Sequence, residues 1–123
     1  MKQAYLRIIV LLAVSLVSGH QLLAAQAGMQ CETGPVKKIY GKTHWLVYSC
    51  TDQQTLVIVS EPASPASPFY FTLYRQNGRY HVRGEGSGNS VATDAAYRDL
   101  RKLTTSEIEA LIRQTKNHAD PAR

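Results

Sequence analysis

The sequence predicts an α+β domain, with a small antiparallel β-sheet of four to five strands in a meander and one or two C-terminal α-helices packed on one face. Three observations predict this fold class. Runs rich in aromatic and β-branched residues alternate as strands do between residues 36 and 85. The dipeptide Asn77-Gly78 between two such runs is the strongest hairpin signal in the chain. Helical spacing and a capping signature appear only from Thr93 onward.

The first 27 residues have the features of a secretory signal peptide. Lys2 and Arg7 supply its positive charge, residues 8–17 form an apolar run, and 25–27 (Ala-Gln-Ala) is a small-x-small cleavage site. The apolar run has about ten residues, whereas a membrane span needs about 20. We therefore expect cleavage near Ala27, a soluble mature chain without a membrane span, and a periplasmic or secreted location.

Cleavage after Ala27 leaves 96 of the 123 residues, which is enough for one small domain. We expect this single domain over residues 28–117 and a frayed C-terminal tail over residues 118–123. The signal peptide holds two of the 14 basic residues and none of the nine acidic ones, so the net charge falls from +5 to +3. The remaining basic residues are spread over several elements, and we expect no nucleic-acid partner.

Two cysteines, Cys31 and Cys50, lie in the mature chain. An exported chain with two cysteines most simply forms one disulfide. It would close a loop of about 20 residues and stabilise the fold by roughly 3 kcal/mol. Redox chemistry is less well supported because there is no CxxC spacing, and lipidation of Cys31 is a poor fit because Met29 and Gln30 precede it.

Three strands are expected before the hairpin, over Val36–Tyr40, Thr43–Cys50 and Thr55–Ser60. The second has apolar side chains on both faces, with Trp45 on one and Tyr48 on the other, which indicates an interior strand. The third is a nearly continuous β-branched run and should be the most buried. Residues 28–34 are expected to be an irregular lead-in. The proline-rich segment 61–68 is expected to be a stiff surface spacer.

A two-residue turn at Asn77-Gly78 sets the register of the hairpin Phe69–Glu85, with Leu73 opposite Val82. One face of this hairpin is then a core face, made by Phe71, Leu73, Tyr80 and Val82. The other face combines aromatic, ionisable and polar side chains: Tyr70, Thr72, Tyr74, His81, Arg83 and Glu85.

Tyrosine and arginine are over-represented at binding hot spots, because each combines a large contact area with a polar tip. The candidate binding residues are therefore Tyr70, Tyr74, His81 and Arg83, together with Ser87 in the loop that follows. The alternative is that the helices cover this face of the hairpin, so that its tyrosines belong to the core.

Residues 84–90 are interpreted as a flexible glycine-rich link to two helices. The first is expected over Asp94–Lys102, with Thr93 as its N-cap. The second should begin with a capping box, Thr104 and Glu107, and fade near Asn117. Leu103 can pack on Ile108 as a hydrophobic staple. The face of this second helix at helical spacing is Ile108, Leu111, Ile112 and Thr115.

No motif in the sequence predicts catalytic residues, a cofactor or a metal. The mature histidines lie in three different elements, without the close spacing of a metal site. The spacing Gly84-x-Gly86-x-Gly88 lacks the βαβ context of a dinucleotide site. Ser87, His81 and Asp94 could in principle form a Ser–His–acid set, so a small envelope enzyme that uses His81 stays open as an alternative.

Two short segments, Tyr48-Ser49-Cys50 and Gly84–Gly88, resemble parts of the small exported inhibitors of C-type lysozyme. Those inhibitors carry a Tyr-x-Cys strand and a Ser-Gly-x-Gly loop that enters the lysozyme cleft. The resemblance covers fewer than ten residues. It departs from the inhibitors in architecture, because they are closed β-barrels and this chain turns helical after the loop. It implies an inhibitor or immunity protein against an envelope hydrolase such as lysozyme, with a protruding loop at residues 84–88.

The residues themselves favour a different function. A small domain with an export signal, one disulfide and no catalytic motif is expected to be a non-catalytic protein of the bacterial cell envelope. The candidate binding residues on the hairpin indicate that it binds another protein or a component of the envelope.

Overall fold

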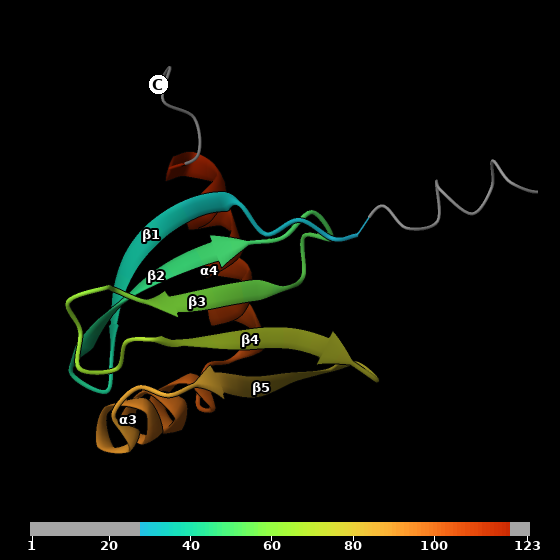
Figure 1. The fold of residues 1–123 in the computed structure, drawn as a ribbon. Helices are drawn as coiled ribbons and strands as arrows, with labels where there is room; N and C mark the ends of the chain where they lie inside the picture. Colours follow the sequence, from blue (N-terminus) through green and yellow to red (C-terminus); the bar gives the residue numbers. More distant parts are fainter. Residues whose placement is uncertain (1–27, 119–123) are drawn as a thin grey trace, which may run out of the picture.

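The computed structural model describes residues 28–118, so the expected signal peptide and residues 119–123 of the expected tail lie outside it. Its five strands are β1 (Thr33–Tyr40), β2 (Thr43–Ser49), β3 (Leu56–Ser60), β4 (Phe69–Gln76) and β5 (Arg79–Gly86). They form one antiparallel sheet in sequence order, and helices α3 (Ser90–Leu100) and α4 (Thr105–His118) pack on one face of it (Figure 1). The predicted α+β meander is confirmed.

The hydrophobic core lies between the sheet and the two helices. The strands contribute Trp45, Val47, Leu56, Ile58, Phe71 and Leu73, and the helices contribute Ala96, Leu100, Ile108, Leu111 and Ile112. Trp45 is fully buried, and its ring centroid lies 5.1 Å from that of Phe71. Its indole N–H donates to the carbonyl of Tyr40 at 3.1 Å, so the polar group of this buried side chain has a partner.

The central hairpin has the predicted register. Leu73 lies opposite Val82, and Gln76 lies opposite Arg79. The turn residues Asn77 and Gly78 both have positive φ angles, of 53° and 76°, as a type I′ turn requires. This register places Leu73 and Phe71 in the core, as predicted.

Strand β1 begins at Thr33, so the predicted irregular lead-in over residues 28–34 is wrong for its last two residues. Pro35 lies inside the strand, where the register with β2 shifts between Thr33 and Val36. Since β1 is an edge strand, the missing N–H of a proline costs no hydrogen bond to a further strand. Pro35 therefore lies at a local irregularity within β1, and the strand begins before it.

Strand β3 is buried on one face only. Leu56, Ile58 and Ser60 are buried, whereas Val57 and Val59 are half-buried on the side away from the helices. The β-branched run thus reflects the preference of such residues for a strand, and two covered faces are not needed to explain it. β2 is an interior strand, as predicted.

The proline-rich segment 61–68 packs against the residues that follow β5. Ala66 is fully buried, so the segment is more than a surface spacer. The backbone N–H groups of residues 87–89 donate to carbonyls of the segment at 3.0 to 3.2 Å. A Cβ atom on Gly88 would overlap the carbonyl of Ala66. The prediction of a flexible link at residues 84–90 is therefore wrong, because these glycines allow close packing.

Helix α3 begins at Ser90, four residues before the predicted start at Asp94, and ends at Leu100, two residues before the predicted end at Lys102. Asn89 is the N-cap, and its side-chain oxygen accepts hydrogen bonds from two backbone N–H groups of the first turn. Thr93, the predicted N-cap, is buried inside the helix. Asparagine caps helices at least as well as threonine, and the earlier start brings Thr93 onto the buried side of the helix.

Helix α4 begins with the predicted capping box. The N–H of Thr104 donates to Glu107 Oε2 at 2.9 Å, and the N–H of Glu107 donates to Thr104 Oγ1 at 3.2 Å. The predicted core face is buried, and it consists of Ile108, Leu111, Ile112 and Thr115. The helix ends at His118, one residue beyond the predicted end at Asn117.

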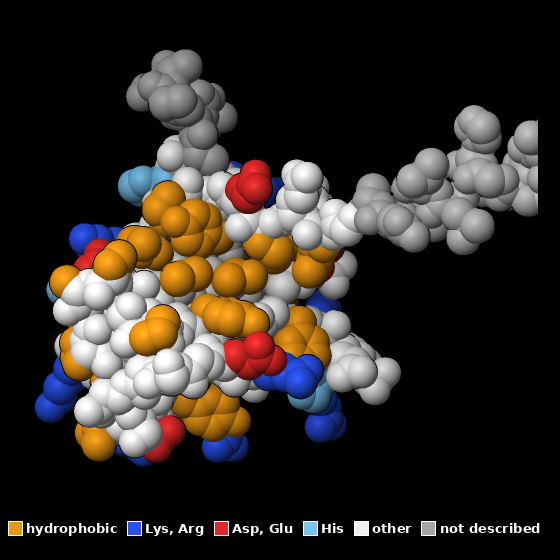
Figure 2. Space-filling model, viewed as in Figure 1, with side chains coloured by type: hydrophobic (Ala, Val, Ile, Leu, Met, Phe, Trp, Pro, Cys, Tyr) orange, Lys and Arg blue, Asp and Glu red, His pale blue; other side chains and the backbone are white. Residues whose placement is uncertain are grey.

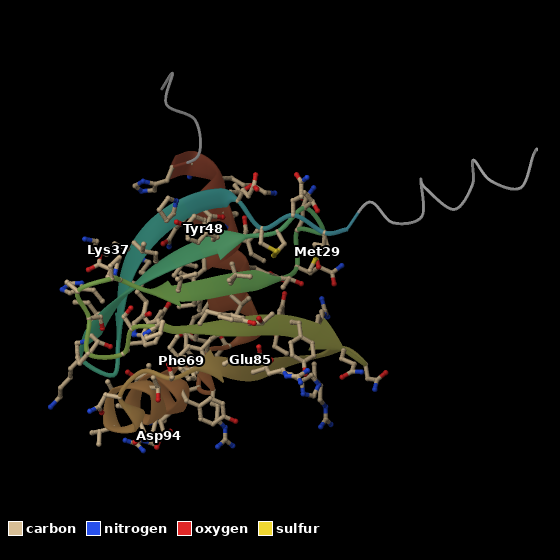
Figure 3. The ribbon with its side chains drawn as sticks, viewed as in Figure 1. Met29, Lys37, Tyr48, Phe69, Glu85 and Asp94 are labelled. Carbon is tan, nitrogen blue, oxygen red and sulfur yellow. A yellow bond between two sulfur atoms is a disulfide. The ribbon has the colours of Figure 1, made fainter. Side chains whose placement is uncertain are left out.

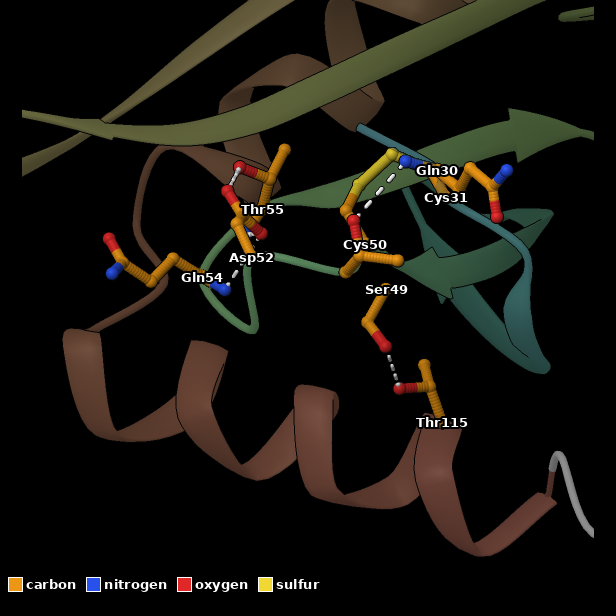
Figure 4. The surroundings of a disulfide bond; sticks show 9 residues. Gln30, Cys31, Ser49, Cys50, Asp52, Gln54, Thr55 and Thr115 are labelled. Atoms are coloured by element: carbon orange, nitrogen blue, oxygen red, sulfur yellow. Dashed lines mark hydrogen bonds between the residues drawn. A yellow bond between two sulfur atoms is a disulfide. The ribbon is translucent and has the colours of Figure 1, made fainter. Parts of the chain in front are cut away.

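Cys31 and Cys50 form the predicted disulfide, with an S–S distance of 2.01 Å (Figure 4). It joins the segment before β1 to the end of β2, and beside it the N–H of Thr51 donates to the carbonyl of Gln30 at 2.7 Å. A structural disulfide indicates an oxidising compartment, such as the periplasm or the cell exterior. Within residues 28–118, no helix is long and apolar enough to cross a membrane.

Asp52 holds the turn between β2 and β3 (Figure 4). Its carboxylate accepts hydrogen bonds from the N–H of Gln54, the N–H of Thr55 and the hydroxyl of Thr55, at 3.0, 2.9 and 2.6 Å. Partial burial raises the pKa of this carboxyl. The hydrogen bonds, led by the one from the Thr55 hydroxyl, lower it by more, so the pKa of Asp52 lies below its ordinary value of 3.8.

The lowered pKa of Asp52 predicts that this residue contributes to the loss of folding stability at acidic pH. Because unfolded Asp52 takes up a proton at higher pH than folded Asp52, its stabilising contribution is complete above about pH 5 and is lost as the pH falls through the folded pKa. Urea denaturation between about pH 6 and pH 2 should show a smaller loss of stability for Asp52→Asn than for the wild type. Asp94→Asn, at an exposed carboxylate of α3, is the matched control. Equal losses for Asp52→Asn and the wild type would contradict the prediction.

Candidate functional site

The face of the sheet opposite the helices, called here the open face, has no second layer of the described chain on it (Figure 2). The side chains on it are Lys37, Ile39, His44, Leu46, Tyr48, Val57, Val59, Tyr70, Thr72, Tyr74, His81, Arg83 and Glu85. The helices cover the Phe71 and Leu73 side of the hairpin, and Tyr70 on the other side is 40% exposed. The alternative that the helices cover the tyrosine face is therefore wrong.

The strand register arranges these side chains in rows across the sheet. One row runs from β1 to β5 in the order Lys37, Leu46, Val59, Tyr70 and Glu85. The next row runs from β2 to β5 in the order Tyr48, Val57, Thr72 and Arg83. In the first of these rows, apolar and aromatic side chains lie in the middle and charged ones at the two ends. The β1 edge also carries Ile39, which is 61% exposed. Figure 3 shows Lys37 and Glu85 at these opposite edges.

Four of the predicted binding residues come together on the β4–β5 half of the open face. Tyr74 stacks on His81, with ring centroids 5.5 Å apart. The hydroxyl of Tyr70 donates to Glu85 Oε2 at 2.7 Å, and Arg83 Nε lies 3.9 Å from Glu85 Oε1. The hydrogen bond to Glu85, helped by the negative charge of that carboxylate, raises the pKa of Tyr70 above its ordinary value of 10.0.

Two hollows lie on this half of the open face. A hollow of about 560 Å³ is lined by Val57, Val59, Ser60, Ser67, Pro68, Phe69, Tyr70, Glu85, Gly86 and Ser87. A second hollow, of about 320 Å³, is lined by Tyr70, Thr72, Tyr74, Arg83 and Glu85. The fifth predicted binding residue, Ser87, therefore borders the same surface as Tyr70. A larger hollow, of about 760 Å³, lies between α3 and the β1–β2 turn and contains none of the predicted binding residues.

The predicted binding set omitted the central apolar residues of the open face, namely Leu46, Tyr48, Val57 and Val59. Their signal was present in the sequence, because β2 and β3 carry apolar side chains on both faces. Such a pattern is also expected of strands that are covered on both sides, so it could not show which face lacks a cover.

The structure does not assemble the Ser–His–acid set. Within residues 28–118, no hydrogen bond joins His81 to Ser87, Glu85 or Asp94. Asp94 lies on α3, in the other layer of the fold (Figure 3). The same described residues contain no group of three or more His, Cys, Asp and Glu side chains that could hold a metal ion.

The glycine-rich segment also differs from the inhibitor loop that it resembles. Gly84 and Gly86 belong to β5, and a Cβ atom on Gly84 would lie 2.8 Å from the ring of Phe69. Ser87 and Gly88 are held by hydrogen bonds to the carbonyl of Pro68. The segment is thus tied to the sheet and to the proline-rich loop, and it does not form the protruding loop that the resemblance implies.

Comparison of this chain with known protein families, with curated proteins and with solved structures gives no match. The open face is therefore interpreted from its own residues. It combines apolar side chains, aromatic hydroxyls and both signs of charge on one side of the sheet.

Proposed function

We propose that this chain is a small exported protein that binds another protein, or another component of the cell envelope, through the open face and without catalysis. The observation that supports this most is the one-sided covering of the sheet. Both helices pack on the Trp45 side, and apolar side chains gather on the other side (Figure 2). A contiguous, partly exposed apolar patch on one face of a small domain is typical of an interaction site.

The chemistry of the open face supports the same proposal. Tyr70 and Tyr74 combine apolar rings with polar tips, and Arg83 adds a planar cation beside them. The side chains of Val57 and Val59 are half-buried and add apolar contact area next to Tyr70. Such a surface resembles the common plan of protein contacts, in which an apolar centre is bordered by a polar rim. The Cys31–Cys50 disulfide supports a location outside the cytoplasm.

The experiment that tests the proposal compares two faces of one protein. The mature chain is immobilised and exposed to an envelope extract, and the bound components are identified by mass spectrometry. We expect a double variant, Val59→Glu with Tyr70→Ala, to lose the bound component, because it places a charge in the apolar centre and removes an aromatic contact.

The matched control is Val91→Glu on α3, because Val91 is 76% exposed and lies on the helical side. This variant should retain the bound component. Circular dichroism checks that both variants are folded. Equal capture by all three proteins, or capture that depends on Val91 and not on the open face, would contradict the proposal.

A further inference from the structure

We propose that the partner of the open face is a second copy of this chain. The two sheets pack face to face, with Lys37 of each copy beside Glu85 of the other. This inference rests on the proposed function, because it needs the open face to be a contact surface. It goes further by naming the partner and the contacts.

The rows on the open face are complementary to themselves. β3 is the central strand of five, and the row that contains Val59 has Lys37 at one end and Glu85 at the other. A twofold axis parallel to β3 reverses this row, so that Lys37 meets Glu85 of the second copy and Val59 meets its own equivalent. Leu46 then meets Tyr70 in the same way. Each contact occurs twice, as an interface with twofold symmetry requires.

The charges of the open face allow two copies to approach. Lys37 Nζ lies 2.7 Å from Glu61 Oε1, and Arg83 Nε lies 3.9 Å from Glu85 Oε1, so cations and carboxylates occur in pairs there. The cations Arg98, Arg101 and Lys102 lie elsewhere, at the end of α3. A chain with an overall positive charge thus has a nearly balanced open face, and stacking two copies brings no block of like charges together.

The open face is large enough for a weak to moderate dimer. Five strands spaced about 4.8 Å apart, with about seven residues each, give a face of roughly 24 by 23 Å. Two copies in contact would bury roughly 1,100 Å² in total, close to the lower limit of specific interfaces. Sheets that pack face to face with nearly aligned strands are the usual arrangement of a β-sandwich.

Lys37 and Glu85 cannot touch within one copy. They lie on the two edge strands, four strand spacings or about 19 Å apart. Any energetic coupling between these two positions therefore reports a contact between copies. The pair thus provides a test that a change in the stability of one copy cannot imitate.

The test uses analytical ultracentrifugation of the mature chain and two charge reversals. The wild type should form a dimer at micromolar concentration. Lys37→Glu and Glu85→Lys should each weaken the dimer by roughly tenfold or more, because like charges then meet at both edges. An equimolar mixture of the two variants should restore the dimer, since every edge contact again joins opposite charges.

Lys102→Glu makes the same charge change away from the open face and should leave the dimer intact. Lys37→Glu also places two carboxylates side by side within one copy, because Glu61 lies next to position 37. If that local repulsion alone weakened the dimer, adding the Glu85→Lys variant would not restore it. A monomeric wild type, a mixture that stays monomeric, or dimers that persist in both single variants would overturn the inference. A monomeric wild type whose capture of an envelope component still depends on Val59 and Tyr70 would overturn this inference alone and leave the proposed function standing.

Discussion

Replacing Trp45 by alanine is expected to lower the free energy of unfolding by about 4 kcal/mol. The side chain is fully buried between the sheet and the helices, with its ring centroid 5.1 Å from that of Phe71. Truncation removes this packing, leaves a cavity and removes the hydrogen bond that the indole N–H donates to the carbonyl of Tyr40. Since small domains are stable by only about 5 to 15 kcal/mol, the variant should be close to unfolding at room temperature. Urea denaturation followed by circular dichroism measures the change.

Two further variants calibrate this result. Trp45→Phe keeps most of the apolar volume and loses the N–H, so it should cost about half as much. Val91→Ala removes an apolar side chain that is 76% exposed, and it should change the stability by less than about 0.5 kcal/mol. If Trp45→Ala cost no more than Val91→Ala, Trp45 would not be at the centre of the core.

Removing the disulfide with Cys31→Ala and Cys50→Ala together is expected to lower the free energy of unfolding by about 3 kcal/mol. The bond joins positions 19 residues apart, and its loss frees that loop in the unfolded state. Replacing Cys50 by alanine also removes a buried sulfur atom, because this side chain is only 4% exposed, and this lowers the free energy of unfolding further. Urea denaturation under oxidising conditions gives the difference between the variant and the wild type.

Reductant provides the internal control for this second prediction. It should lower the stability of the wild type to nearly that of the double variant and leave the double variant unchanged. Thiol titration of the unfolded, unreduced wild type should find no free thiol. A wild type that reductant does not destabilise would show that the bond contributes little to the fold.

Several elements could be predicted because they depend on residues close together in the chain. The register of β4 and β5 follows from the two residues between them, Asn77 and Gly78. The start of α4 follows from Thr104 and Glu107, which satisfy each other's backbone N–H groups. The disulfide could be predicted because two cysteines allow one pairing.

Other features depend on contacts between distant segments, and the sequence alone could not determine them. Thr93 and Asn89 are both acceptable N-caps, and packing of α3 on the sheet decides between them. Gly88 lies in a segment whose composition is typical of a flexible link. In the structure it is needed because Ala66, on another loop, packs too closely for a larger side chain. The side that carries the helices decides whether Tyr70 is core or surface, and no local pattern contains that information.

One contact links the last helix to the first half of the sheet. The hydroxyl of Thr115 in α4 lies 2.7 Å from the hydroxyl of Ser49 in β2, 66 positions earlier in the chain (Figure 4). A polypeptide that emerges N-terminus first cannot close its core until α4 has also emerged. Until then the core face of the sheet does not have α4 packed on it. The domain can therefore close its core only when nearly the whole polypeptide is available, because α4 supplies one side of that core.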